Sequence, residues 1–248
     1  MKTMIHAHRG ASFYRPENTI EAFSLAIEQG ADCLELDVHL SKDGEIVVAH
    51  DEHLERVSDG TGHINDYSLD ELKTFNFGRL FPGNKYKIPT LSEVFTLVKP
   101  TGLSLNIELK GVTRLYHKLP GKLITLAKEH NMEDRIIYSS FNHYFLQQMK
   151  KTIPSIKIGL LYEIGLVDPW VYAKYLNADA IHPHFMIVAA LPETVKHCHE
   201  NNIKVNVWTA DDPNVIKLML KYNVDSIITN KPDMTFSCRQ EVINEGAK

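Results

Sequence analysis

The sequence predicts an α/β protein built as one (β/α)8 barrel, or TIM barrel, over residues 1–248, with a small insertion at about residues 51–87 after the second strand. Three observations favour this fold. About eight apolar runs of strand length alternate with amphipathic helical segments along the chain. The length of 248 residues agrees with the ~250 residues typical of such barrels. The polar residues that could carry chemistry follow the ends of the apolar runs, where a TIM barrel places its active site.

The clearest strand is the run Cys33–Leu40, in which apolar and polar residues alternate with a period of two. Its apolar members share one face and are Leu34, Leu36, Val38 and Leu40. Glu35 and Asp37 point together in the opposite direction. Two carboxylates on one face repel each other, so we expect a cationic group between them. The alternative is a surface strand whose acids are solvated.

The elements around this strand have clear start and stop signals. The apolar run Met4–His8 predicts the first strand, and the capping box Asn18-Thr-Ile-Glu21 opens a helix that ends at Gly30. The stretch from about residue 51 to 87 is rich in Gly, Asp, Asn and aromatics, with one short helix starting at Ser68. Such a stretch within a compact barrel usually forms a lid or rim over the site. A second capping box at Thr90-Leu-Ser-Glu93 starts the next helix.

From there strands and helices alternate regularly. The remaining predicted strands are Ser104–Lys110, Arg135–Ser140, Lys157–Tyr162, Ala180–His184, Lys204–Ala210 and Ser226–Asn230. The helices predicted between and after them are Leu119–His130, Asn142–Ile153, Asp168–Leu176, Leu191–Asn201, Pro213–Tyr222 and Pro232–Ile243. An open doubly wound sheet is the alternative. That fold usually carries a Gly-rich nucleotide-binding turn after its first strand, and Arg9-Gly10-Ala11-Ser12 is not such a turn.

Composition and charge exclude several classes of function. Hydrophobic residues make up 44% and charged residues 23% of the chain, as in ordinary soluble proteins. The formal net charge of −4 gives no bulk attraction to nucleic acid. No run is long and apolar enough to span a membrane, and the N-terminus lacks the apolar core of a signal peptide. The three cysteines are far apart and without metal-binding spacing, which predicts free thiols and a cytoplasmic location.

Residues able to carry chemistry gather at the predicted strand ends. In chain order they are His8, Arg9, Glu35, Asp37, His50, Glu108, Lys110, His182, Trp208 and Asn230. Clusters of carboxylates suit hard divalent cations such as Mg²⁺ or Ca²⁺ better than zinc. Arg9 and Lys110 would suit a phosphate. Together with two histidines, of which His50 is braced by the neighbouring Asp51, these groups suggest phosphoryl transfer with a general acid and a general base.

The chain resembles bacterial glycerophosphodiester phosphodiesterases in an ordered series of motifs from about His6 to Pro232. The motifs are His8-Arg9-Gly10, Pro16-Glu17-Asn18-Thr19, Glu35-Leu-Asp37-Val38, Asp43-Gly44, His50-Asp51, Gly60-Thr-Gly62, Ile88-Pro89-Thr90-Leu91, Asn106-Ile-Glu108-Leu-Lys110, Ser139-Ser140-Phe141, Trp208-Thr209 and Thr229-Asn230-Lys231-Pro232. No single motif is decisive, but the ordered set is very specific. One departure is Ala210-Asp211, where an Asn often ends the motif that begins at Trp208.

The resemblance implies a TIM barrel that hydrolyses glycerophosphodiesters to glycerol 3-phosphate and an alcohol, with a place in lipid and glycerol metabolism. It also implies one divalent metal ion, Mg²⁺ or Ca²⁺. The implied site residues are Glu35, Asp37 and Glu108 for the metal, His8 and His50 for acid–base catalysis, and Arg9, Lys110 and Trp208 for the substrate. The expected partner is a small-molecule glycerophosphodiester, without nucleic acid or membrane insertion, and the protein is expected to be a monomer or homodimer.

Other functions remain open on the sequence alone. A phospholipase D-like lyase could use the same barrel, because a hydroxyl of the substrate can replace water and close a cyclic phosphate. A non-catalytic phosphodiester-binding barrel would need a broken metal or acid–base set, and neither set is broken here. His6 and His8 could imitate the HxH pair of a zinc amidohydrolase, but strand eight ends in Asn230 rather than in the Asp such sites use. Accordingly, His6 is expected deep in the barrel and His182 at its rim or in a supporting position.

Overall fold

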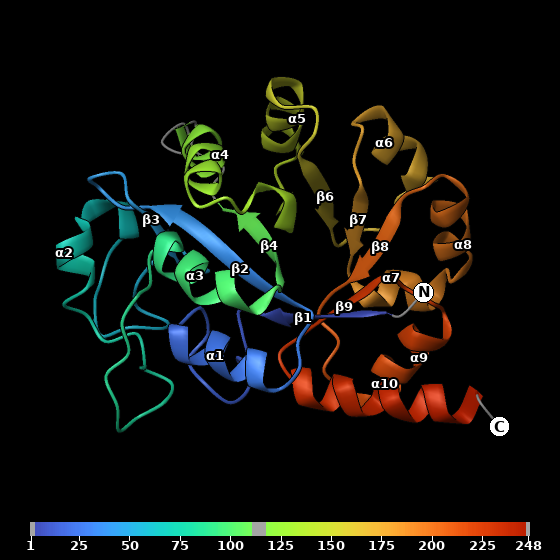
Figure 1. Ribbon diagram of the computed structural model, residues 1–248, viewed down its shortest axis with the longest axis horizontal. Coiled ribbons are helices and arrows are strands. Elements are labelled where there is room, and N and C mark those ends of the chain that lie inside the picture. The colour runs from blue at the N-terminus through green and yellow to red at the C-terminus, as the bar shows by residue number, and fades with distance from the viewer. Residues whose placement is uncertain (1–2, 111–117, 247–248) are drawn as a thin grey trace.

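A computed structural model describes residues 3–110 and 118–246 (Figure 1). Its strands are β1 (Met4–His8), β2 (Cys33–Leu40), β3 (Ile46–Val48), β4 (Ser104–Leu109), β5 (Ile136–Ser140), β6 (Lys157–Tyr162), β7 (Ala180–Pro183), β8 (Lys204–Val207) and β9 (Ser226–Thr229). Its α-helices are α1 (Ile20–Glu28), α2 (Leu69–Leu72), α3 (Leu91–Val98), α4 (Leu119–Glu129), α5 (His143–Thr152), α6 (Pro169–Tyr175), α7 (Phe185–Ala190), α8 (Glu193–Glu200), α9 (Pro213–Lys221) and α10 (Pro232–Gly246).

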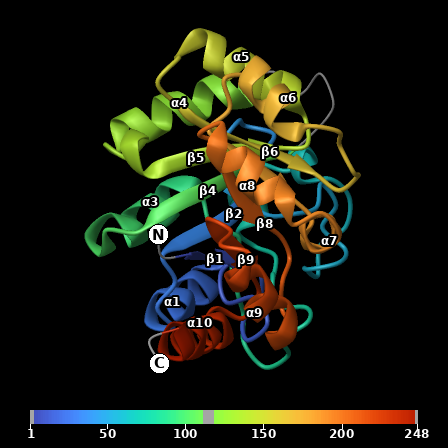
Figure 2. The same ribbon diagram turned by 90° about the vertical axis from the view of Figure 1, so that its right-hand side faces the viewer.

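All strands except β3 pair in parallel and close into a ring. The order is β1-β9-β8-β7-β6-β5-β4-β2, and β1 pairs with β2 to complete the circle. β3 pairs antiparallel with the far end of β2, where Val48 lies opposite Val38. Figure 2 shows helices surrounding the ring on its outside, with the first and last helices, α1 and α10, close to each other. The predicted TIM barrel is therefore confirmed.

The main core lies between the barrel wall and the surrounding helices. On β2, Leu34, Leu36 and Val38 are buried in this core, whereas Glu35 and Asp37 belong to the polar cluster at the barrel mouth. Every residue of β2 is buried. The two-residue period predicted for this strand is thus confirmed, and the alternative of a solvated surface strand is wrong.

Side-chain caps start three helices near their predicted positions. Ser68 and Thr90 form capping boxes with Glu71 and Glu93, as the sequence predicts for Thr90. The cap of α1 is Thr19 rather than Asn18, because the Thr19 side chain accepts from the amide of Ala22. Asn18 is thereby free for another role: its Nδ2 donates to Asp37 Oδ2 over 2.8 Å.

The sequence predicts a helix over Leu191–Asn201 after β7, and α8 lies within that range. The short helix α7 that precedes it is not predicted from the sequence. Leu191 has φ −134° and ψ 68°, outside the helical region. Pro192 follows it, and a proline disfavours the helical conformation of the residue before it, so α7 ends before Leu191 and α8 begins after Pro192. Trp208 also lies just beyond β8, which ends at Val207.

Residues 52–89, here called the extension, leave and rejoin the barrel beside the end of β2 (Figure 1). Val47 and Thr90, which flank the extension, form an antiparallel bridge. A small core separate from the main one lies here and comprises Val47, Ala49, Leu54, Val57, Ile64, Leu72, Phe77 and Ile88. The extension therefore holds its side chains in place by its own packing.

Among the described residues, no helix has the combined length and hydropathy required to cross a bilayer.

Candidate active site

One pocket opens at the carboxyl ends of the barrel strands. Its lining comprises His8, Arg9, Glu35, His50, Asn106, Glu108, Lys110, Ser139, Phe141, Leu161, Trp208 and Ile228, and it encloses about 360 Å³ of space that is open to solvent. Of the eight site residues that the resemblance implies, all but Asp37 line this pocket. Asp37 lies next to this lining, because its carboxylate is part of the cluster formed with Glu35 and Glu108.

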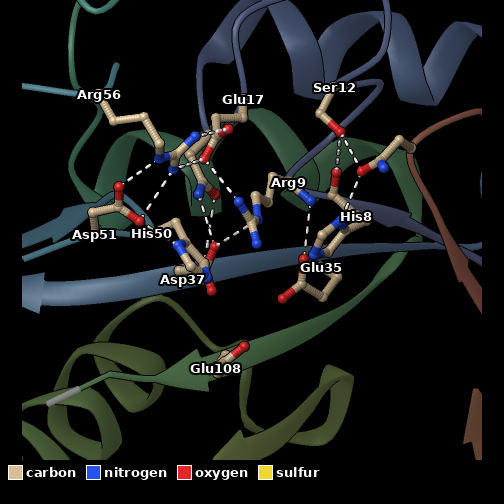
Figure 3. A network of polar contacts seen from close by, with 12 residues as sticks. His8, Arg9, Ser12, Glu17, Glu35, Asp37, His50, Asp51, Arg56 and Glu108 are labelled. Atoms are coloured by element: carbon tan, nitrogen blue, oxygen red, sulfur yellow. Dashed lines mark hydrogen bonds and ion pairs between the residues drawn. The ribbon is translucent and has the colours of Figure 1, made fainter. Parts of the chain in front are cut away.

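The carboxylates of Glu35, Asp37 and Glu108 meet because β2 and β4 are neighbours, with Asp37 directly opposite Glu108 in the parallel register. One oxygen from each residue lies within 4.8 Å of the other two, and all three side chains are buried. Glu35 Oε2 also accepts from the backbone amide of Arg9 over 2.9 Å (Figure 3). In the part of the chain that the structure describes, this is the one such group of His, Cys, Asp or Glu side chains.

The charges of these carboxylates are unequally compensated. Burial raises the pKa of Glu108 to about 7, although the Lys110 ammonium, 2.5 Å away, opposes the shift. Burial and the charges of Asp37 and Glu108 raise the pKa of Glu35 well above its usual range. Burial also acts on Asp37, but Lys110 and Arg9 outweigh it and hold the Asp37 pKa far below its usual range. A buried set of oxygen ligands with surplus negative charge fits a hard divalent cation.

His8 is oriented by an amide from the last strand of the barrel. Its Nδ1 lies 2.6 Å from Asn230 Oδ1, and Asn230 Nδ2 donates to Asp211 Oδ2 over 2.5 Å. Ser12 Oγ donates to the same Asn230 oxygen over 2.7 Å. Because an amide oxygen only accepts, neutral His8 carries its hydrogen on Nδ1 and a lone pair on Nε2. Burial lowers the pKa of His8 to about 4, so the unprotonated ring is favoured.

His50 has a charged partner instead. Its Nδ1 lies 2.5 Å from Asp51 Oδ1, and its backbone carbonyl is 3.0 Å from His39 Nε2. Burial lowers the pKa of His50, while the negative charges of Asp37 and Asp51 oppose that shift. The two pocket histidines therefore differ in electrostatic setting, one with a neutral amide and one with a carboxylate.

The Arg9 guanidinium is held between two carboxylates. Its Nη1 donates to Glu17 Oε1 over 2.9 Å, and its Nε lies 3.5 Å from Asp37 Oδ2. Lys110 Nζ reaches the other Asp37 oxygen at 3.0 Å. The cationic group expected beside the carboxylates of β2 is thus supplied by two residues, Arg9 and Lys110, both of which also line the pocket.

Trp208 and Phe141 form an aromatic part of the pocket lining. Their ring centroids are 5.5 Å apart in an edge-to-face arrangement, and Trp208 Nε1 donates to the carbonyl of His182 over 2.7 Å. The His182 side chain does not lie at the rim, as one sequence expectation had it. It is fully buried, with Nε2 2.9 Å from Asn206 Nδ2. This position requires Gly159, because a Cβ there would lie 2.2 Å from His182 Nε2.

Several residues at the site were not assigned a role from the sequence. They are Ser12, Glu17, Asn18, Arg56, Asn106, Phe141 and Asp211, together with Asn230, which the sequence places only at a strand end. Most of them lie within or beside the recognised motifs, which is the signal that could have identified them. Arg56 has no such local signal, since its partner Glu17 is 39 residues away.

A closed parallel barrel with ionisable side chains gathered at the carboxyl ends of its strands defines a TIM-barrel enzyme. The model of the glycerophosphoryl diester phosphodiesterase family matches residues 8–234, and the chain belongs to that family. The resemblance seen in the motifs, and the prediction of an enzyme, are both confirmed.

Known members are similar over nearly their whole length. The chain is 46% identical over 237 residues to a glycerophosphodiester phosphodiesterase of Caldanaerobacter subterraneus subsp. tengcongensis, covering 94% of this chain and 96% of that protein. It is 35% identical over 243 residues to one from Bacillus altitudinis, covering 97% and 99%. A solved Oleispira antarctica phosphodiesterase in complex with the product sn-glycerol-3-phosphate has a TM-score of 0.86 and 28% identity, covering 97% and 96%.

Proposed function

We propose that the protein hydrolyses glycerophosphodiesters to glycerol 3-phosphate and an alcohol, with one divalent metal ion and with His8 and His50 as the acid–base pair. The observation that carries this proposal is that both histidines line the same pocket as Glu35 and Glu108 of the carboxylate cluster. Family membership supports the reaction class. The glycerol 3-phosphate product is supported by the Oleispira antarctica relative, which was solved with that compound.

Glu35, Asp37 and Glu108 would hold the metal ion. Their ligand atoms are all carboxylate oxygens and lie within 4.8 Å of one another, which suits Mg²⁺ or Ca²⁺ rather than zinc. When bound, the ion would supply positive charge that polarises the phosphoryl group. The raised pKa values of Glu35 and Glu108 mean that binding competes with protonation of these two side chains.

The partners of the two histidines suggest their roles. His8, paired with a neutral amide and unprotonated at neutral pH, suits the base that takes a proton from the attacking nucleophile at Nε2. Burial lowers the pKa of His50 as well, but the Asp51 carboxylate at Nδ1 and the charge of Asp37 oppose that shift, so His50 holds a proton more readily than a ring paired with a neutral amide. His50 therefore suits the acid that protonates the oxygen of the departing alcohol. In both residues Nδ1 is engaged, which leaves Nε2 for the substrate.

The remaining pocket residues would bind the substrate. Arg9 and Lys110 place two positive charges beside the site expected for the phosphate. Trp208 and Phe141 offer apolar area for the carbon chain of glycerol. The small pocket suits a deacylated diester.

Phosphorus NMR of glycerophosphocholine turnover tests the proposal. We expect open-chain glycerol 3-phosphate as the product, loss of turnover in EDTA and recovery on addition of Mg²⁺ or Ca²⁺. A cyclic phosphate as the final product would establish the lyase alternative instead. Full turnover after thorough chelation would contradict the metal requirement.

We also infer a cytoplasmic location, which is supported by three free and buried cysteines, Cys33, Cys198 and Cys238. Fusion of the protein to a fluorescent reporter tests this location. A monomer or homodimer remains the prediction for the assembly, to be measured by light scattering.

A further inference from the structure

The Arg56 side chain joins two carboxylates at the edge of the pocket (Figure 3). Its Nη1 and Nη2 donate to the two oxygens of Glu17, each over 2.7 Å. Its Nε donates to Asp51 Oδ2 over 2.5 Å, and Nη2 also reaches Asp51 Oδ1 at 3.2 Å. Such a fork fixes both partners in orientation as well as in distance, which a lysine could not do.

The backbone of Arg56 is held by the core of the extension. Leu54 is fully buried and Val57 is nearly so, and both belong to the small core of that segment. The carbonyl of Val57 accepts from the amide of Arg79, and that of Leu54 from the amide and hydroxyl of Ser58. The guanidinium is thus delivered to the pocket edge by the packing of the extension, although the side chain itself is 40% exposed.

Through Asp51, Arg56 acts on His50. Asp51 Oδ1 lies 2.5 Å from His50 Nδ1, while Arg56 contacts both oxygens of the same carboxylate. A partly exposed carboxylate without such a partner would rotate and present its oxygens to water. Held by Arg56, Asp51 keeps one oxygen directed at Nδ1, so Nε2 of His50 keeps one direction in the pocket.

On its other side Arg56 connects to the carboxylate cluster. Glu17 Oε1, which accepts from Arg56, also accepts from Arg9 Nη1 over 2.9 Å. Arg9 Nε is in turn 3.5 Å from Asp37. Charges of alternating sign therefore run from Asp51 to Asp37, with Arg56 as the link between Glu17 and Asp51. Without this cation, Glu17 would keep its contact with Arg9, whereas Asp51 would lose the guanidinium that contacts both of its oxygens.

We propose that Arg56 is a positioning residue. It acts on His50 through Asp51 and thereby makes the extension part of the catalytic arrangement. This inference rests on the proposed catalytic role of His50. Replacement by Arg56→Gln is expected to lower kcat about 10- to 100-fold, because a misplacement of ~1 Å can cost about 100-fold. KM should change less than about threefold, since Arg56 does not line the pocket.

A double-mutant cycle distinguishes positioning from a general loss of structure. Turnover of glycerophosphocholine in Mg²⁺ is measured for Arg56→Gln, His50→Ala and the double variant. If Arg56 acts through His50, then Arg56→Gln costs less than about threefold once His50 is absent. The same 10- to 100-fold loss in both backgrounds would overturn the inference while leaving the proposed function intact. Near-normal turnover of His50→Ala alone would instead contradict the proposed function.

Arg79→Gln is the matched control, since Arg79 lies in the same extension and donates to the carbonyl of Glu55, without contact to Asp51 or Glu17 in the described structure. Its kcat should stay within about twofold of the parent. An equal loss of kcat in Arg79→Gln and Arg56→Gln would overturn the inference, because the effect would then belong to the extension as a whole.

Chemical rescue gives a second, independent readout. In Arg56→Ala, methylguanidinium should restore part of the lost kcat by occupying the space between Glu17 and Asp51, and it should leave Arg79→Ala unchanged. No rescue in a folded Arg56→Ala protein would count against the inference. If Arg56→Ala does not fold, the double-mutant cycle with Arg56→Gln decides the inference.

Discussion

His8 Nδ1 lies 2.6 Å from Asn230 Oδ1, although 222 residues separate the two along the chain. The bond crosses the junction at which the first and last strands pair and the barrel closes. Asp211, which follows β8, in turn receives the Asn230 amide group. The orientation of one pocket histidine is therefore set by three strand ends together.

Exchange of this amide and carboxylate should move the pH profile. In Asp211→Asn/Asn230→Asp the hydrogen-bonded chain is kept, but the carboxylate now lies at His8 Nδ1. A negative neighbour stabilises the imidazolium, so the pKa of His8 should rise from about 4 by about 1–3 units. Since the base works unprotonated, the acidic limb of kcat/KM should move to higher pH by the same amount. An unmoved limb would show that His8 is not the base.

Removal of one carboxylate should stabilise the metal-free protein at alkaline pH. The pKa of Glu35 is raised in the folded state, so the folded protein binds more protons than the unfolded one, and its free energy of unfolding falls as pH rises above about 4.5. Glu35→Gln should therefore raise Tm at pH 8 in EDTA, by about 2–4 °C for each kcal/mol gained.

The same variant should lose the stabilisation that Mg²⁺ gives the parent protein, because a ligand of the ion is gone. Thermal unfolding at pH 5.5 and pH 8, with EDTA or Mg²⁺, measures both effects. Glu129→Gln, an exposed position on α4, serves as the control for the change of charge alone. An undiminished Mg²⁺ shift in Glu35→Gln would exclude Glu35 as a ligand.

The two histidines should be separable by the choice of leaving group. His8→Ala and His50→Ala should each lower kcat about 100-fold or more on glycerophosphocholine. In a glycerophosphodiester of p-nitrophenol, the p-nitrophenolate leaving group departs without protonation. His50→Ala should therefore regain most of its rate on this substrate, whereas His8→Ala should not. Recovery by His8→Ala alone would reverse the two assignments.

Recognition should rest on the glycerol side of the diester. Choline, ethanolamine and glycerol head groups should give kcat/KM values within about 100-fold of one another, and a simple aryl phosphodiester without glycerol should be much slower. Trp208→Ala should raise KM about tenfold with a smaller change in kcat, and Trp208→Phe should keep most of the binding. A preference above about 100-fold for one head group would place recognition on the alcohol side.

Local periodicity was sufficient to predict the barrel and the carboxylate cluster. The alternation in β2 puts Glu35 and Asp37 on one face, and the parallel pairing of β2 with β4 then brings Glu108 beside them. The contacts of Arg56 and His182 could not be predicted from the sequence. Each depends on a side chain meeting a distant segment, Glu17 in one case and the space above Gly159 in the other, and no short-range pattern records such a meeting.

The bridge between Val47 and Thr90 draws together the chain before and after the extension, and the extension also contacts the rest of the chain at Glu17 and Asp43. His8 belongs to the barrel wall, whereas the carboxylate partner of His50 is held by a residue of the extension. The support of His50 therefore comes in part from the extension, whereas that of His8 comes from the strand ends of the barrel. Grafting an extension from another family member at these paired ends would retune protonation of the leaving alcohol while the base and the carboxylate cluster stay unaltered.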